Sequence, residues 1–138
     1  MYVHHAEMFA MSELMPVENR PHQIGELAER FGITLRTIRF YEQKGLIAPR
    51  RIGANMRLFD VADVARLGLI VACRRFRFTV EAIAELLAAR DVLGPEDFRP
   101  HFAEALTRRH AELTAEIAEI EQVRHELFGF LSDSVRRT

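Results

Sequence analysis

The chain has 138 residues, enough for one domain or for a small domain plus an appendage, and its 49% hydrophobic and 28% charged residues are ordinary for a globular protein. Its single cysteine excludes a disulfide framework and a cysteine-rich metal site. Because no apolar run approaches the length of a membrane span and the start does not resemble a secretory signal, we expect a cytoplasmic protein with no membrane partner.

The net charge of −1 hides an uneven distribution of charged residues along the chain. Residues 22–77 contain eleven basic and five acidic residues, whereas residues 78–138 contain seven basic and twelve acidic residues. A basic block beside an acidic block indicates a part that faces nucleic acid, joined to a part with another task.

The first elements predict a helix-turn-helix. Residues 1–21 show no sustained period, and we interpret them as a flexible extension. Apolar residues spaced as on one helical face then predict a short helix that ends at Gly32. Thr34 is the expected cap of a second helix, which runs to Gln43 or Lys44 and stops before Gly45.

Residues 47–59 contain Pro49, Gly53 and Asn55, which exclude a helix. Apolar residues flank the Gly-Ala-Asn centre of this segment, so we expect a small two-stranded hairpin, or wing.

Two further helices and a long one complete the chain. Asp60, with Asp63 three residues later, predicts a capping box for the third helix, and Thr79 predicts the cap of the fourth. Gly94 and Pro95 predict a break, after which His101 to Leu131 reads as one long helix.

The second helix carries the candidate DNA contacts. Arg36, Thr37 and Arg39 lie on the side opposite the expected core residues Ile38 and Tyr41. In the first turns of a recognition helix, arginine reads guanine, and threonine contacts phosphate or a thymine methyl group. The alternative is a solvated arginine face on a structural helix, but the preceding turn and the basic wing favour nucleic acid.

The long helix carries a candidate dimer interface. Leucines and isoleucines recur every seven residues, and a second row follows four residues later in each heptad, which is typical of a coiled coil. The alternative is a helix packed on its own domain, which is too small to cover it. The predicted interface residues are Leu106, Leu113, Ile117, Ile120, Leu127 and Leu131.

Neither catalysis nor metal binding has a supporting motif. No phosphate-binding glycine loop or nucleophile elbow is present, so we expect no enzyme, no catalytic residue and no cofactor. The histidines of the long helix do not have a chelating spacing, so we expect no metal site. Cys73 is interpreted as a core residue, although a redox role stays open, as does an organic effector.

Several motifs follow one another in residues 22–90: Ile24-Gly25-Glu26-Leu27-Ala28, Thr37-Ile38-Arg39-Phe40-Tyr41-Glu42, Gly45-Leu46-Ile47, Arg57-Leu58-Phe59 and Asp63-Val64-Ala65-Arg66-Leu67. Their order and spacing resemble the MerR family of bacterial transcription regulators. The resemblance implies a mainly helical fold: a winged helix-turn-helix, a second helix pair, and a long helix that pairs antiparallel in a homodimer. It also implies a pseudo-palindromic promoter operator, which the protein distorts, with RNA polymerase as a partner.

The resemblance also implies which residues contact DNA. They are Thr34, Arg36, Thr37, Arg39 and Phe40 of the recognition helix, and Arg50, Arg51 and Arg57 of the wing. Four positions depart from the family pattern. His22 and Gln23 replace an aromatic residue and a threonine, Met56 replaces a tyrosine, and Arg77 replaces a glycine, where a left-handed conformation would cost about 1 kcal/mol.

We therefore predict three parts: a flexible extension (residues 1–21), a winged helix-turn-helix domain (residues 22–90), and a linker with a dimerisation helix (residues 91–138). The predicted function is sequence-specific DNA binding and transcription regulation as a homodimer. The alternative is a non-enzymatic adaptor or nucleoid-type binding module. The thiol sensors of the family have cysteines near and after the start of the long helix, where this chain has none, so the effector stays open.

Overall fold

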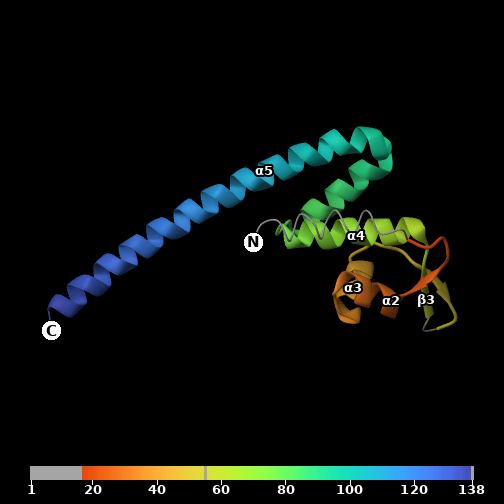
Figure 1. Ribbon diagram of the computed structural model, residues 1–138, viewed down its shortest axis with the longest axis horizontal. Coiled ribbons are helices and arrows are strands. Elements are labelled where there is room, and N and C mark those ends of the chain that lie inside the picture. The colour runs from red at the N-terminus through yellow and green to blue at the C-terminus, as the bar shows by residue number, and fades with distance from the viewer. Residues whose placement is uncertain (1–16, 55, 138) are drawn as a thin grey trace. The chain divides into compact units, whose positions relative to one another are not determined.

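A computed structural model describes residues 17–54 and 56–137 (Figure 1). Residues 1–16 of the predicted extension, and Asn55 at the centre of the predicted wing, lie outside the described residues. The chain divides into two compact units, Met1–Asp91 and Val92–Thr138, which are described separately below.

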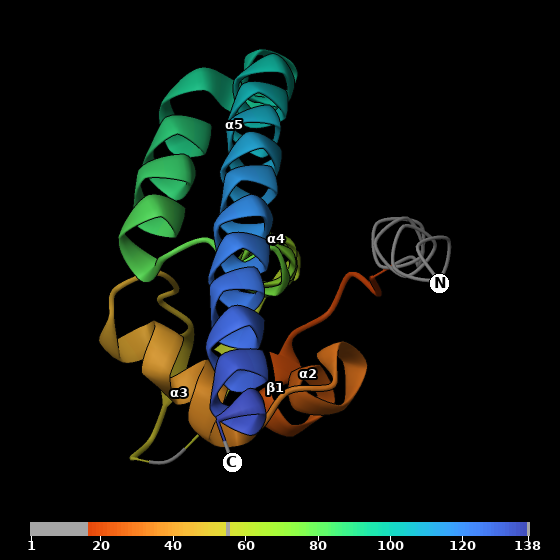
Figure 2. The same ribbon diagram turned by 90° about the vertical axis from the view of Figure 1, so that its left-hand side faces the viewer.

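The helix-turn-helix prediction is confirmed. Helix α2 (Ile24–Phe31) ends at Gly32, whose φ of 64° is the left-handed conformation that glycine adopts at low cost. Helix α3 (Leu35–Gln43) begins after Thr34, whose side chain accepts a hydrogen bond from the backbone N–H of Thr37 at 3.1 Å. The two short helices pack on each other, as Figure 2 shows.

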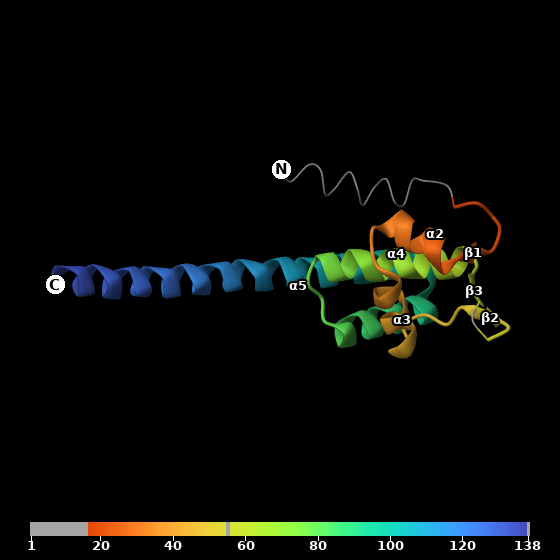
Figure 3. The same cartoon turned by 90° about the horizontal axis from the view of Figure 1, so that it is seen from below.

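The wing has the predicted hairpin and one strand more. Strands β2 (Arg50–Ile52) and β3 (Met56–Phe59) pair antiparallel. The predicted hairpin is confirmed, and a strand that the sequence analysis did not predict, β1 (His22–Gln23), also pairs antiparallel with β3 and gives the order β1-β3-β2 (Figure 3). The sheet therefore joins the chain just before α2 to the wing.

Helix α4 (Val61–Arg75) begins with the predicted capping box. The backbone N–H of Asp63 donates to the Asp60 carboxylate at 2.8 Å, and the N–H of Asp60 donates back to Asp63 at 2.9 Å. Helix α2 packs against α4 and β3, and β3 packs against α4. The fully buried apolar side chains of this unit come from every helix and from β3: Leu27, Ile38, Phe59, Leu67, Ile70 and Ile83.

Arg77 lies in the turn after α4 with a φ of 64°, a conformation that is strained for a residue with a Cβ atom. We expect Arg77→Gly to raise the free energy of unfolding by about 0.5–1 kcal/mol, since the relief of strain exceeds the added entropy of the unfolded glycine. Urea unfolding followed by circular dichroism measures this. As a control, Arg75→Gly, at the last residue of α4, should lower the free energy of unfolding, by up to about 1 kcal/mol, because glycine disfavours the helical conformation. Equal effects of the two substitutions on the free energy of unfolding would contradict the conclusion that Arg77 is strained.

Helix α5 (Val80–Arg136) begins in the first unit and continues through the second. Thr79 caps it as predicted, since its hydroxyl accepts from the N–H of Ala82 at 3.1 Å. The predicted break is present, because Gly94 has non-helical dihedral angles (φ 77°, ψ 172°). The expected start at His101 was too late. Helical structure resumes at Pro95, since the first turn of a helix accepts proline, and it continues through Pro100.

Candidate nucleic-acid interface

Helix α3 has a buried face and an exposed face. Ile38 and Tyr41 are buried, as predicted, whereas Arg36 and Arg39 are exposed and Phe40 is 39% exposed. Neither Arg36 nor Arg39 forms an ion pair with any residue that the structure describes. Two guanidinium groups on this helix are therefore available to an external acceptor.

The start of α3 carries two hydroxyl groups. The Thr34 and Thr37 hydroxyls lie 2.8 Å apart, and Thr34 also accepts the backbone N–H of Thr37. This double contact fixes both side chains at the first turn of the helix. A threonine hydroxyl both donates and accepts, so each retains capacity for a further hydrogen bond.

The wing arginines are not equivalent. Arg50 is exposed and forms no ion pair within residues 17–54 and 56–137, whereas Arg51 and Arg57 both bind the carboxylate of Glu42 on α3. Each of these two contacts measures 2.5 Å. The structure thus brings two predicted DNA contacts onto the recognition helix through an acidic residue that sequence reasoning did not select. The sequence offered one signal for Glu42, which is an acidic residue inside the basic block and close in sequence to the predicted DNA contacts.

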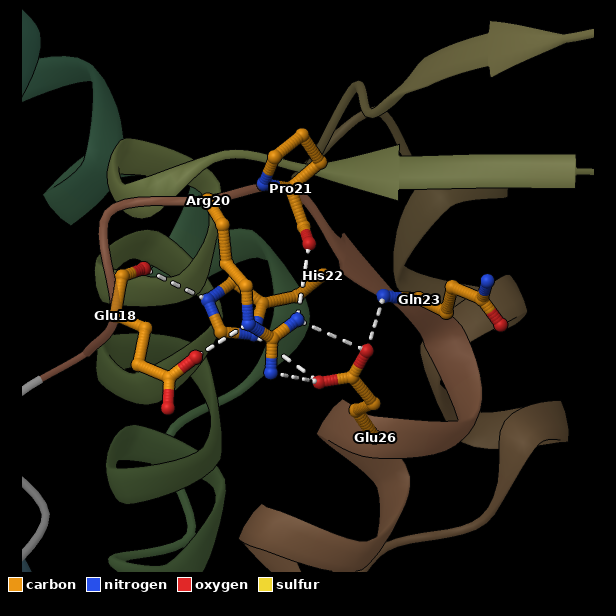
Figure 4. Close-up of polar contacts among 6 residues, drawn as sticks. All are labelled: Glu18, Arg20, Pro21, His22, Gln23 and Glu26. Carbon is orange, nitrogen blue, oxygen red and sulfur yellow. Dashed lines mark hydrogen bonds and ion pairs between the residues drawn. The ribbon is translucent and has the colours of Figure 1, made fainter.

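A polar network holds the segment before α2 (Figure 4). Arg20 bonds to both Glu18 and Glu26, with Nη2 of Arg20 at 2.8 Å from Oε2 of Glu26. The hydrogen bond from Arg20 lowers the pKa of Glu26 to about 2. The buried His22 ring lies 3.0 Å from the Glu18 carbonyl oxygen and 3.4 Å from Glu26. Of the residues that the sequence analysis assigned to the extension, Arg20 thus contacts Glu26 of α2, and Glu18 contacts Arg20 and His22 of β1.

Cys73 is buried in α4, as predicted, and burial raises the pKa of its thiol to about 12. Its thiolate fraction at neutral pH is therefore very low, and the thiolate is the reactive form. We expect an aromatic disulfide reagent to react with native protein at least about a hundredfold more slowly than with urea-unfolded protein. Equal rates, measured by absorbance of the released thiol, would show that Cys73 is accessible.

The second unit has an uncovered apolar stripe. Ile117, Ile120, Leu127 and Leu131 of the predicted interface are each more than half exposed in the single chain, whereas Leu106 and Leu113 are half-buried. They recur at the spacing of one helical face.

None of the helices in residues 17–54 and 56–137 combines the length and the apolar character that a membrane span requires.

Two family profiles match the chain. The profile described as "MerR HTH family regulatory protein" matches residues 23–90, and the one described as "MerR, DNA binding" matches residues 64–129. Together they include α2, α3, the wing, α4 and most of α5.

Several curated relatives are regulators. The "Mercuric resistance operon regulatory protein" of Pseudomonas fluorescens is 34% identical over 105 residues, which is 75% of this chain and 72% of the relative. The "HTH-type transcriptional regulator ZntR" of Escherichia coli (strain K12) is 32% identical over 108 residues, which is 77% of this chain and 75% of the relative.

Solved structures agree with this result. The structure of "the transcription regulator PbrR691 from Ralstonia metallidurans CH34 in complex with Lead(II)" is 32% identical, with a TM-score of 0.61 over 78% of this chain and 83% of that one. "HiNmlR, a MerR family regulator lacking the sensor domain, bound to promoter DNA" shares the fold at 21% identity, with a TM-score of 0.56 over 75% of this chain and 77% of that one. The chain belongs to the MerR family of helix-turn-helix transcription regulators.

Proposed function

We propose that this regulator binds a pseudo-palindromic promoter operator as a homodimer and distorts the DNA at its centre. The observation that carries the proposal is the exposed face of α3, where Arg36 and Arg39 have no ion-pair partner among the described residues. Adjacent elements add the arginines of the wing. A helix with free guanidinium groups beside a basic hairpin fits a major groove flanked by phosphates.

The DNA contacts divide into two kinds. Thr34, Arg36, Thr37, Arg39 and Phe40 lie on the groove-facing turns, where arginine discriminates guanine, and hydroxyl or apolar groups meet phosphate or thymine. The wing residues bind backbone phosphates and thereby position the protein without reading sequence. The members of this second group are Arg50, Arg51 and Arg57.

Dimerisation follows from the uncovered stripe of α5. Two such helices would bury Ile117, Ile120, Leu127 and Leu131 against each other, with Leu106 and Leu113 extending the contact, in an antiparallel coiled coil. A twofold-symmetric protein requires a twofold-symmetric operator, so each recognition helix reads one half-site. RNA polymerase at the same promoter is the partner through which the complex regulates transcription. The protein acts in the cytoplasm and catalyses no reaction.

The relatives with metals in their names raise the question of a metal effector. Mercury and lead favour thiolate ligands, yet the only thiol of this chain is the buried Cys73, whose raised pKa keeps it protonated. Within the described ranges, no group of three His, Cys, Asp or Glu side chains is arranged to hold an ion. These residues do not fit a thiolate metal site, and we propose that the effector, if any, is not a thiophilic metal.

The test begins with selection of duplexes from a random pool by the wild-type protein. The proposal requires an inverted repeat among the selected duplexes, a footprint over both half-sites, and enhanced chemical reactivity of the central base pairs. Affinity should fall steeply with salt, because phosphate contacts release counterions. Binding without sequence preference would support a nucleoid-type module, and absence of binding would support an adaptor.

A further inference from the structure

Glu42 joins the recognition helix to both strands of the wing hairpin. Its side chain lies near the end of α3 and is 13% exposed. Oε1 accepts a hydrogen bond from Nη2 of Arg51 on β2, and Oε2 accepts one from Nε of Arg57 on β3, each at 2.5 Å. One side chain therefore uses both oxygens to hold two strands.

The two arginines need a counter-charge between them. Arg51 and Arg57 are directly opposite each other in the β2–β3 register, and like charges at such a position destabilise a sheet. Burial would raise the pKa of Glu42, but the hydrogen bonds and charges of the two arginines prevail and lower it. Glu42 is consequently ionised at neutral pH and compensates both guanidinium groups.

This contact leaves the arginines able to bind DNA. A guanidinium group has five N–H donors, and Glu42 engages Nε of Arg57 and Nη2 of Arg51 only. The Nη groups of Arg57 remain free of Glu42, on a side chain whose direction is now fixed. A preorganised donor loses less conformational entropy on binding than a mobile one.

We propose that Glu42 is a positioning residue for DNA recognition. It holds Arg51 and Arg57 at a fixed place relative to α3, so that contacts to the phosphates and contacts in the groove form together. The proposal rests on the proposed function, since it concerns the same DNA interface.

The sign of the effect separates this role from that of an ordinary surface acid. A carboxylate near DNA repels phosphates, so removing its charge strengthens binding to any sequence. Removing a positioning carboxylate releases the wing arginines and weakens binding to the specific site. The change of charge is identical in the two cases, whereas the change of operator affinity is opposite.

The experiment compares Glu42→Gln with Glu29→Gln in the full chain. Glu29 is an exposed carboxylate of α2 that makes no ion pair with any described residue, so it reports the loss of charge alone. Fluorescence anisotropy measures affinity for a duplex selected by the wild-type protein and for a shuffled duplex of equal composition. We expect Glu42→Gln to lower the affinity for the selected duplex about tenfold without lowering the affinity for the shuffled duplex. Glu29→Gln should slightly raise the affinity for both duplexes.

A second measurement needs no DNA. Amide hydrogen exchange of residues 50–59 should become about tenfold faster in Glu42→Gln, with exchange in α4 unchanged. Arg51→Ala removes one arm of the contact at an exposed side chain, so it should also accelerate exchange in the hairpin even if Glu42→Gln does not fold. Unchanged hairpin exchange in Arg51→Ala would overturn the proposal.

The DNA-binding measurement can also contradict the proposal. The proposal is wrong if Glu42→Gln binds both duplexes more tightly, as Glu29→Gln does. If the wild-type protein does not distinguish the two duplexes, the proposed function fails, and the exchange measurement still decides whether Glu42 holds the wing.

Discussion

Arg39→Ala is expected to lower operator affinity by about 1–3 kcal/mol for each half-site, with the fold intact. Arg39 is exposed on α3 and has no ion-pair partner within the described residues, so its removal opens no core and leaves no buried charge. The loss comes from hydrogen bonds to a base edge or to a phosphate. Discrimination between the selected and the shuffled duplex should fall with the affinity if Arg39 reads a base.

The control for Arg39→Ala is Arg108→Ala, which removes the same side chain from an exposed position on α5. We expect Arg108→Ala to leave operator affinity within about twofold of wild type, because single surface changes away from a site alter free energies little. Circular dichroism and thermal unfolding establish that both variants fold. Wild-type operator affinity in a folded Arg39→Ala protein would show that α3 is not part of the DNA interface.

Ile120→Asp is expected to dissociate the dimer. Ile120 lies at the centre of the stripe formed by the predicted coiled-coil residues and is 66% exposed in the single chain. Association would bury an unpaired carboxylate in each subunit and lose the burial of each isoleucine. The combined cost, about 3 kcal/mol or more, raises the dissociation constant more than a hundredfold. Sedimentation or light scattering measures the change.

Ala118→Asp provides the matched control for this change. Ala118 is exposed and lies about 160° from Ile120 around the helix, so the same aspartate stays in water. We expect Ala118→Asp to remain dimeric and to bind operator as wild type does, whereas Ile120→Asp should lose operator binding with its dimerisation. A dimeric Ile120→Asp protein would place the interface on another face.

Local signals in the sequence were sufficient to predict the ends of α2, the start of α3 and the start of α4. Gly32 after an apolar face and Thr34 before the next helix marked both ends of the turn, and Asp60 with Asp63 marked the start of α4. These signals are reliable because a cap or a left-handed stop involves atoms within four residues of one another. The sequence around each helix end is therefore enough to recognise it.

Residues far apart in sequence supplied what the sequence could not. The strand His22–Gln23 has only two residues, too few to show a period, and it exists because Phe59 and Leu58 of β3 lie beside it.

The sequence by itself determined the helix-turn-helix, the wing hairpin, the caps and the family, because each depends on short patterns and their spacing. Only the tertiary structure decided that Glu42 lies between Arg51 and Arg57, and that Arg36 and Arg39 have no such partner in the part of the chain that the structure describes. The physical reason is that the composition and periodicity of a sequence show where charged residues occur but do not show which of them form ion pairs. Which acid neutralises which arginine depends on the register of β2 with β3 and on the packing of the sheet against the helices.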